Sequence, residues 1–328
     1  MRVEQREAIN RGMSPKMKKT LRVVLIAAAG LVVAIGLFLV IVFIVNMIST
    51  QSEQAKIEPY GQLVSVDGKK MNVAIQGNGE ETVVLLPGYG TAAPALDFKL
   101  LVDELSPYYK VVAIEPFGYG LSDDTEKERT TENIVREIHD ALQQLQIDRY
   151  ILMGHSIAGL YGIDYVNQYP NEVRAFIGID SSVPTQPGMD VEFPLKTFEF
   201  LKKSGLLRLG INVSGDPYAA LPFDEHTKEQ MIMLMKQNAN NDTMLNEMKH
   251  ISTNFKEAQH LTFPNNLPVL LFIEDSNTSV AGWEALHEEQ VKDAEYGKVI
   301  KLEGDHYLHH TQSKAIAESF RAFMQELK

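Results

Sequence analysis

The chain has 328 residues, of which 45% are hydrophobic and 23% are charged, so it has the composition of a globular protein rather than a disordered one. It contains no cysteine, which excludes disulfide bonds, thiolate metal sites and a cysteine nucleophile. Residues 1–22 carry seven Lys/Arg and two Asp/Glu; the chain totals of 31 and 43 then leave 24 and 41 for the rest, a formal charge of −17. An acidic globular part argues against a nucleic-acid partner, because phosphate binding needs clustered positive charge.

The first predicted element is a membrane-spanning helix. Residues 23–48 form a run of 26 residues without a charged side chain. As a helix this run would be about 39 Å long, more than the roughly 30 Å of a bilayer's hydrocarbon core. A cleaved signal peptide would have an apolar core of only about 7–15 residues and a small-x-small cleavage site, which residues 47–50 do not provide. The sequence therefore predicts an uncleaved anchor.

The charges beside this run predict its orientation. Five Lys/Arg lie between residues 11 and 22, whereas only Lys56 follows closely on the other side. By the positive-inside rule, we expect a single-pass cell-membrane protein with a cytoplasmic N-terminus. The predicted organisation is a basic cytoplasmic tail (1–22), a transmembrane helix (23–48), a polar linker (49–58) and an extracytoplasmic globular domain (59–328).

From residue 60 onward, short apolar runs alternate with helical patterns. The predicted strands are 60–66, 71–76, 83–86, 111–115, 150–153, 175–179, 269–273 and 298–302. The predicted helices are 95–105, 131–146, 159–168, 283–293 and 312–327. Asp67-Gly68 between the first two strands indicates a hairpin. Fully apolar strands that alternate with helices indicate a parallel sheet covered on both faces.

Residues 184–266 interrupt this alternation. They contain no convincing strand pattern, but they show helical patterns such as 195–207 and 225–238, together with six of the chain's 13 methionines. We interpret the segment as a helical insert over the carboxyl edge of the sheet. Its methionines suit an adaptable apolar binding wall, or they serve ordinary helix packing.

The most specific motif is Gly154-His155-Ser156-Ile157-Ala158-Gly159, written 154–159 below. It directly follows the strand 150–153 and opens a helix, which is the context of a nucleophile elbow. The serine of such an elbow lies on a tight strand-to-helix turn, so its neighbours must be small. Ser156 is therefore the predicted nucleophile.

A histidine just beyond the last strand supplies the predicted base. His306 follows the strand 298–302 closely and can reach the serine across the edge of the sheet. A serine hydroxyl is a weak nucleophile unless an imidazole takes its proton. His309 and His310 begin the next helix, and we expect them to pack or to cap it.

The loop after the strand 83–86 reads Pro87-Gly88-Tyr89-Gly90, written 87–90 below, and its backbone N–H groups can point toward the serine. The N–H groups of Tyr89 and Ile157 would then form an oxyanion hole. The alternative is a plain turn at the end of the strand.

Together with residues 115–123, these motifs resemble the α/β-hydrolase fold superfamily, in the branch of esterases and lipases with a helical cap. The resemblance extends over residues 60–328 and implies an α/β fold with a mostly parallel eight-stranded sheet, helices on both faces and a cap at about 184–266. Two positions depart from the family pattern. Pro87 stands where the family usually has His, and Ala158 stands where Gly is usual, but neither change removes a catalytic group.

The same resemblance places the acid of the triad after strand six or, more often, after strand seven. After strand seven, Asn277 occupies the expected position, so Asp275 would serve only if the loop were displaced by two residues. Asp180 stands at the end of strand six. A carboxylate must hold the imidazole tautomer and stabilise its charged form. Asp180 and Asp275 both remain candidates, and Glu274 is a third.

The sequence thus predicts a carboxylic ester hydrolase that acts on a small-molecule ester through an acyl-serine intermediate, with no metal and no organic cofactor. A Met-rich cap beside a membrane anchor favours lipid-derived or acyl esters. The alternatives are a peptidase of the same fold and a non-catalytic binding or sensing domain. Epoxide hydrolases and haloalkane dehalogenases share the fold but have Asp at the elbow, so Ser156 argues against them.

Overall fold

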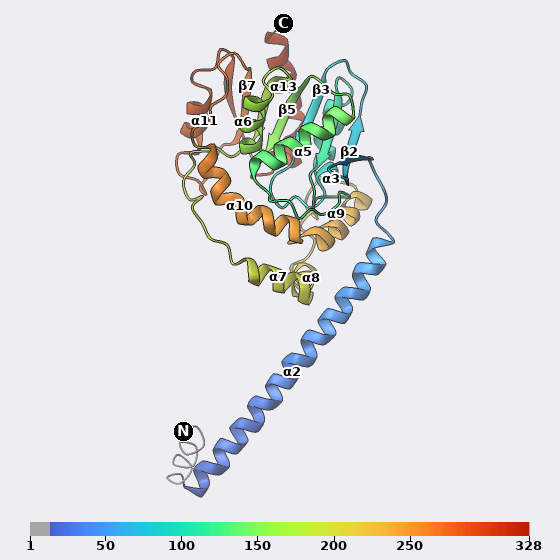
Figure 1. The fold of residues 1–328 in the computed structure, drawn as a ribbon, viewed down its shortest axis with the longest axis vertical. Helices are drawn as coiled ribbons and strands as arrows, with labels where there is room; N and C mark the ends of the chain where they lie inside the picture. The colour runs from blue at the N-terminus through green and yellow to red at the C-terminus, as the bar shows by residue number, and fades with distance from the viewer. Residues whose placement is uncertain (1–13, 328) are drawn as a thin grey trace.

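The computed structural model describes residues 14–327. A globular body holds the sheet, its covering helices and the insert, and one long straight helix projects from it (Figure 1). That helix, α2 (Pro15–Gln54), has 40 residues. Its first turn is set locally, because the Ser14 side chain accepts a hydrogen bond from the Met17 N–H and a proline follows at the first helical position.

The body is built on one eight-stranded sheet with the order β1-β2-β4-β3-β5-β6-β7-β8. The strands are β1 (Gln62–Val66), β2 (Lys69–Gln76), β3 (Thr82–Leu86), β4 (Lys110–Glu115), β5 (Tyr150–His155), β6 (Val173–Ile179), β7 (Val269–Glu274) and β8 (Gly297–Leu302). Strands β1 and β2 pair antiparallel, β2 joins β4 antiparallel, and all pairings from β4 to β8 are parallel. The predicted mostly parallel eight-stranded sheet is confirmed.

Helices cover both faces of this sheet. They are α3 (Pro94–Asp97), α4 (Lys99–Leu105), α5 (Thr131–Gln144), α6 (Ala158–Gln168), α11 (Trp283–Val291), α12 (Leu308–Thr311) and α13 (Ser313–Glu326). Alternate residues of a strand face opposite sides. Val84 accordingly belongs to the core that α5 and α6 cover, whereas Val83 belongs to the core that α4 and α13 cover. The strands are thus buried on both faces, as their apolar runs predict.

The insert is helical, and it lies below the body in Figure 1. It contains α7 (Leu195–Ser204), α8 (Leu206–Ser214), α9 (Glu225–Asn238) and α10 (Asp242–Ala258). The pattern at 195–207 is divided into two helices at Gly205, whose φ of 81° ends α7. Met231, Met244 and Met248 are buried. For these three methionines ordinary packing applies, whereas Met189 lines the cavity described below.

Helix α2 has the length and composition of a membrane span. Its most apolar 18-residue window has a mean hydropathy of 3.1, and none of its residues is buried. The helix continues to Gln54, so the first six residues of the expected linker 49–58 are helical. Of the expected basic tail 1–22, residues 1–13 lie outside the described part of the chain.

Candidate active site

Ser156 lies at the turn between β5 and α6, with a φ of 55°. A positive φ is uncommon outside glycine and marks a backbone that its surroundings hold in place. The neighbouring positions must be small. A Cβ at Gly154 would lie 2.9 Å from the Ala158 Cβ, and one at Gly159 would collide with the carbonyl oxygen of Ser182. Ala158 therefore fits the elbow because Gly154 has no side chain.

His306 reaches this serine from the loop after β8. Its Nε2 lies 2.9 Å from the Ser156 Oγ. The two residues are 150 positions apart, but β5 and β8 are parallel strands of one sheet, so the loops at their carboxyl ends meet at the same edge. The structure thus brings together the predicted nucleophile and the predicted base.

Asp180 completes the arrangement. Its Oδ2 accepts a 2.6 Å hydrogen bond from the His306 Nδ1–H. The carboxylate is fully buried, and its Oδ1 accepts hydrogen bonds from the Trp283 indole N–H at 2.8 Å and from the Glu274 backbone N–H at 3.1 Å. Because an ionised carboxylate only accepts hydrogen bonds, Nδ1 carries the proton and Nε2 is left as the acceptor for the serine hydroxyl.

The other acid candidates lie elsewhere. Asp275 continues the pairing of β7 through a backbone hydrogen bond to the Leu302 carbonyl, and its exposed carboxylate makes no hydrogen bond to any residue from 14 to 327. Glu274 lines the site cavity, and burial, with the charge of Asp180, raises the pKa of Glu274. Asn277 folds its loop by accepting hydrogen bonds from the backbone N–H groups of residues 279 and 280. Only Asp180 is brought to the imidazole.

The loop 87–90 packs directly against the elbow. A Cβ at Gly88 would lie 2.8 Å from the His155 Nδ1 and 2.9 Å from the Ser156 Cβ, so only glycine allows this approach. Within residues 14–327 the backbone N–H groups of Tyr89 and Ile157 donate no hydrogen bond. Both residues line the same cavity as Ser156. The Tyr89 hydroxyl donates to the Met244 carbonyl oxygen at 3.0 Å, which connects the loop to α10 of the insert.

A cavity of about 420 Å³ opens over Ser156 and His306. Its apolar wall consists of Ile157, Met189, Ile251, Phe255, Val280 and Trp283. Its polar lining includes Ser182, Gln186, Glu274 and Asn277. An apolar pocket with a few polar groups around a reactive centre is typical of sites for small organic ligands.

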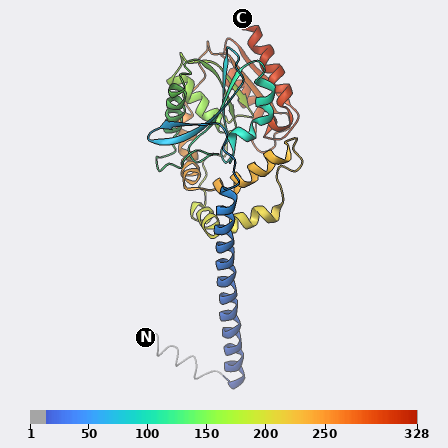
Figure 2. The same cartoon turned by 90° about the vertical axis from the view of Figure 1, so that its right-hand side faces the viewer.

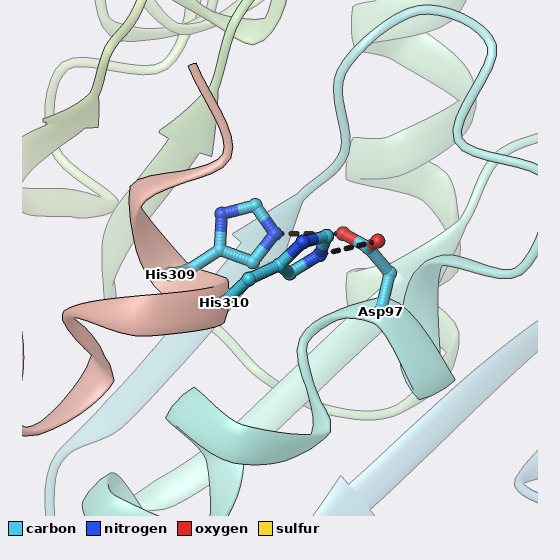
Figure 3. Close-up of side chains that lie close together, drawn as sticks. All are labelled: Asp97, His309 and His310. Atoms are coloured by element: carbon cyan, nitrogen blue, oxygen red, sulfur yellow. Dashed lines mark hydrogen bonds and ion pairs between the residues drawn. The ribbon is translucent and has the colours of Figure 1, made fainter. Parts of the chain in front are cut away.

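Two further histidines, His309 and His310, lie next to each other, and His309 lies close to the elbow residue His155. Figure 3 shows His309 and His310 of α12 pointing at the carboxylate of Asp97 in α3. Their Nε2 atoms lie 2.7 and 2.8 Å from its two oxygens, which are distances of direct N–H···O hydrogen bonds. Burial would raise the pKa of Asp97, but the two histidines hold this pKa well below its usual range. The donor atoms of these three residues lie close enough together to hold a metal ion, and both histidines are buried. The buried His309 Nδ1 has no hydrogen-bond partner among residues 14–327.

His155 supports the site without having been predicted to do so. Its ring is buried, and burial holds the pKa of His155 well below its usual value, so the ring stays neutral. Its Nε2 lies 3.0 Å from the backbone carbonyl oxygen of His306. The ring therefore fixes the backbone that carries the predicted base. The position of His155 inside the elbow motif indicates a role near the site, but the motif does not show which residue its side chain contacts.

Comparisons with known proteins identify the family to which this fold belongs. Residues 81–270 match the model of the α/β hydrolase fold family. This chain belongs to that family. It is also 30% identical over 271 residues to YbdG, an uncharacterised protein of Bacillus subtilis, and the match covers 79% of this chain and 82% of YbdG.

Several solved structures share this fold. An epoxide hydrolase of Vigna radiata, VrEH1, superposes with a TM-score of 0.63 at 18% identity, over 81% of this chain and 97% of that one. The enol-lactonase of Burkholderia xenovorans LB400 superposes with a TM-score of 0.59 at 16% identity, over 80% of this chain and all of that one. These likenesses support the α/β-hydrolase fold.

Proposed function

We propose that the protein is a serine hydrolase that cleaves carboxylic esters through an acyl-serine intermediate. The observation that carries this proposal is the continuous chain of hydrogen bonds from the Ser156 hydroxyl through His306 to the buried carboxylate of Asp180. Such a chain activates a hydroxyl that is otherwise a weak nucleophile at neutral pH.

The reaction follows from these contacts. As the Ser156 oxygen attacks the ester carbonyl, His306 Nε2 takes its proton, and Asp180 stabilises the resulting imidazolium. The negative charge on the former carbonyl oxygen is met by the N–H groups of Tyr89 and Ile157. His306 then gives its proton to the leaving alcohol. Water, deprotonated by the same imidazole, releases the acid and restores the serine.

Two features favour an ester over the substrates of other family members. Epoxide opening on this fold uses a carboxylate at the elbow, whereas this chain has the hydroxyl of Ser156. The cavity wall beside the serine is largely apolar, which suits an acyl chain better than a charged substrate. We therefore propose a small ester with an apolar acyl group, and a lipid-derived ester is the natural candidate.

We further propose that α2 anchors the enzyme in the cell membrane with its N-terminus in the cytoplasm. The helix is long, apolar and without buried residues, and basic residues precede the apolar run. The hydrolase domain would then act outside the cytoplasm, next to the bilayer.

The experiment is hydrolysis of p-nitrophenyl esters of increasing acyl length by the full chain in detergent. We expect turnover that the Ser156→Ala variant lacks, with medium or long acyl chains preferred over acetate. Activity that falls steadily with acyl length would contradict the apolar substrate. Turnover that survives in the Ser156→Ala variant would contradict the proposed chemistry.

A further inference from the structure

One part of the insert differs in charge from the rest of the protein. Helices α7 and α8, residues 195–214, are called the α7–α8 arm below. The arm carries four Lys/Arg and one Glu, a formal charge of +3, whereas residues 23–328 together carry −17. Of these cations Lys196 and Lys203 are exposed, whereas Arg208 is buried. It also exposes large apolar side chains: Phe200 is 53% exposed and Val213 is 79% exposed. Basic and apolar residues on one surface are typical of segments that lie on membranes.

A buried arginine joins this arm to α2. The side chain of Arg208 is only 5% exposed. Its Nε donates to the Asn46 Oδ1 at 2.8 Å, its Nη2 donates to the Thr50 Oγ1 at 2.8 Å, and its Nη1 pairs with Glu53. These three partners are spaced four and three residues apart, so they lie along one face of α2. The guanidinium therefore binds α2 over two turns.

Close backbone packing extends this contact toward the apolar run. Gly205, between α7 and α8, lies against α2, and an added Cβ would be 2.6 Å from the Asn46 Cβ and 3.1 Å from the Val42 carbonyl oxygen. Glycine also permits the local φ of 81°. The arm thus contacts α2 from Val42 to Glu53. Figure 2 shows α7 and α8, in yellow, on either side of the upper end of α2.

The position of this contact along α2 defines its depth in a membrane. The residues from 23 to 45 are free of charged and strongly polar side chains, and as a helix they span about 34 Å, slightly more than the roughly 30 Å hydrocarbon core. Asn46 then falls at the outer boundary of that core. The stretch from Asn46 to Glu53 rises by about 10 Å, which places it in the headgroup layer. The arm is held at the same level.

We propose that the α7–α8 arm is a membrane-contacting surface, held by Arg208 against the outer end of α2, with Phe200 and Val213 in the lipid. Lys196 and Lys203 are exposed on α7 and face anionic headgroups. This inference rests on the proposed anchor. It deepens the proposed function, because the segment that precedes α7 contributes Gln186 and Met189 to the site cavity. Residues 190–194 thus connect the cavity wall at Met189 with the start of the arm.

The absence of cysteine makes the test direct, because a single introduced cysteine can carry a nitroxide spin label. Val213→Cys tests the arm, Val33→Cys in the middle of the apolar run tests the anchor, and Lys314→Cys on α13 is the aqueous reference. The full chain is placed in nanodiscs of phosphatidylcholine and phosphatidylglycerol. Accessibility of each label to oxygen, which concentrates in lipid, is compared with accessibility to a nickel chelate, which stays in water.

We expect position 213 to show a high oxygen-to-nickel ratio, between those of positions 33 and 314. A ratio equal to that of position 314 overturns the inference, and so does low access to both reagents, which would mean that protein covers the arm. A water-like ratio at position 33 overturns the anchor itself, and ester hydrolysis is measured independently of both. The three failures are therefore distinguishable.

A second variant isolates the arginine. In the Val213→Cys background, Arg208→Ala removes the contacts with α2, and we expect nickel access at position 213 to rise severalfold. Arg174→Ala is the matched control, because it removes an arginine of β6 that pairs with Glu81, outside the arm. Unchanged nickel access in the Arg208→Ala variant would overturn the role of this residue.

Discussion

The catalytic edge of the sheet and the α7–α8 arm are held in place by different means. At the catalytic edge, Ser156 and Asp180 directly follow β5 and β6, and both have positive φ angles, 55° and 41°. Their backbone N–H groups donate to the carbonyl oxygens of Ile179 and Phe272, so neighbouring strands hold both turns in place. In the arm, by contrast, no residue of α7 is buried, and the contacts with α2 are made between helix surfaces. The chemistry thus rests on side chains at the ends of buried strands, whereas the arm rests on contacts between helix surfaces.

The largest effect on kcat should come from the catalytic edge of the sheet, through Ser156→Ala. Loss of the attacking hydroxyl should lower kcat for ester hydrolysis by at least about 10⁴-fold, since no other group near His306 replaces it. Steady-state assays with a p-nitrophenyl ester measure this loss. An exposed serine such as Ser279, which lines the same cavity, provides a matched control, and Ser279→Ala should stay near wild-type activity.

The paired variants Asp180→Asn and Asp275→Asn test which carboxylate orients the base. Asparagine at position 180 would donate to His306 and favour the wrong tautomer, so kcat should fall by about 10³–10⁴-fold. Asparagine at the exposed position 275 should change kcat by less than about threefold, as expected for a surface substitution. The reverse outcome would mean that the loop after β7 rearranges when substrate binds.

The sequence predicted that Ser156 and His306 would meet because each lies in a short motif next to a strand, and the structure brings their side chains together. The sequence did not choose between Asp180 and Asp275, because the choice depends on the path of the loop after β7, where Asn277 turns the chain. Contacts between segments that are distant in the sequence could not be predicted either. Arg208 meets Asn46 across 162 positions, and no local pattern marks that pairing.

A smaller effect is expected from Trp283→Phe, which keeps the ring but removes the indole N–H that donates to Asp180. A hydrogen bond to a charged group contributes about 1.5–3 kcal/mol. The Glu274 backbone N–H still donates to the Asp180 carboxylate in this variant, so only part of the stabilisation is lost and kcat/KM should fall by roughly tenfold. The loss should appear mainly in kcat, because the indole N–H contacts Asp180, which orients the base. A change confined to KM would contradict this positioning role.

The smallest predicted effect is on the free energy of unfolding, and it comes from His287 of α11. Burial lowers the pKa of His287, which therefore stays neutral in the folded protein, while in the unfolded chain it takes up a proton below about pH 6.5. Stability from this residue is fully present above pH 6.5 and is lost as the pH falls from there toward its folded pKa, with a limiting slope of about 1.4 kcal/mol per pH unit.

Thermal unfolding of the full chain in detergent between pH 7 and pH 5 measures this loss. The Tm should fall with pH, and it should fall less steeply in the His287→Gln variant, whose side chain does not titrate. A variant with the wild-type slope would show that other groups set the pH dependence.

The most direct measurement for the whole account is the site of reaction with a fluorophosphonate. Such reagents are attacked by a serine only when a neighbouring base activates its hydroxyl. We predict one adduct per chain, located on Ser156 by mass spectrometry of the digested protein, and none in the Asp180→Asn variant over the same time. A protein that stays unlabelled under these conditions, or that is labelled at another residue, would contradict the proposal that this edge of the sheet is an active site.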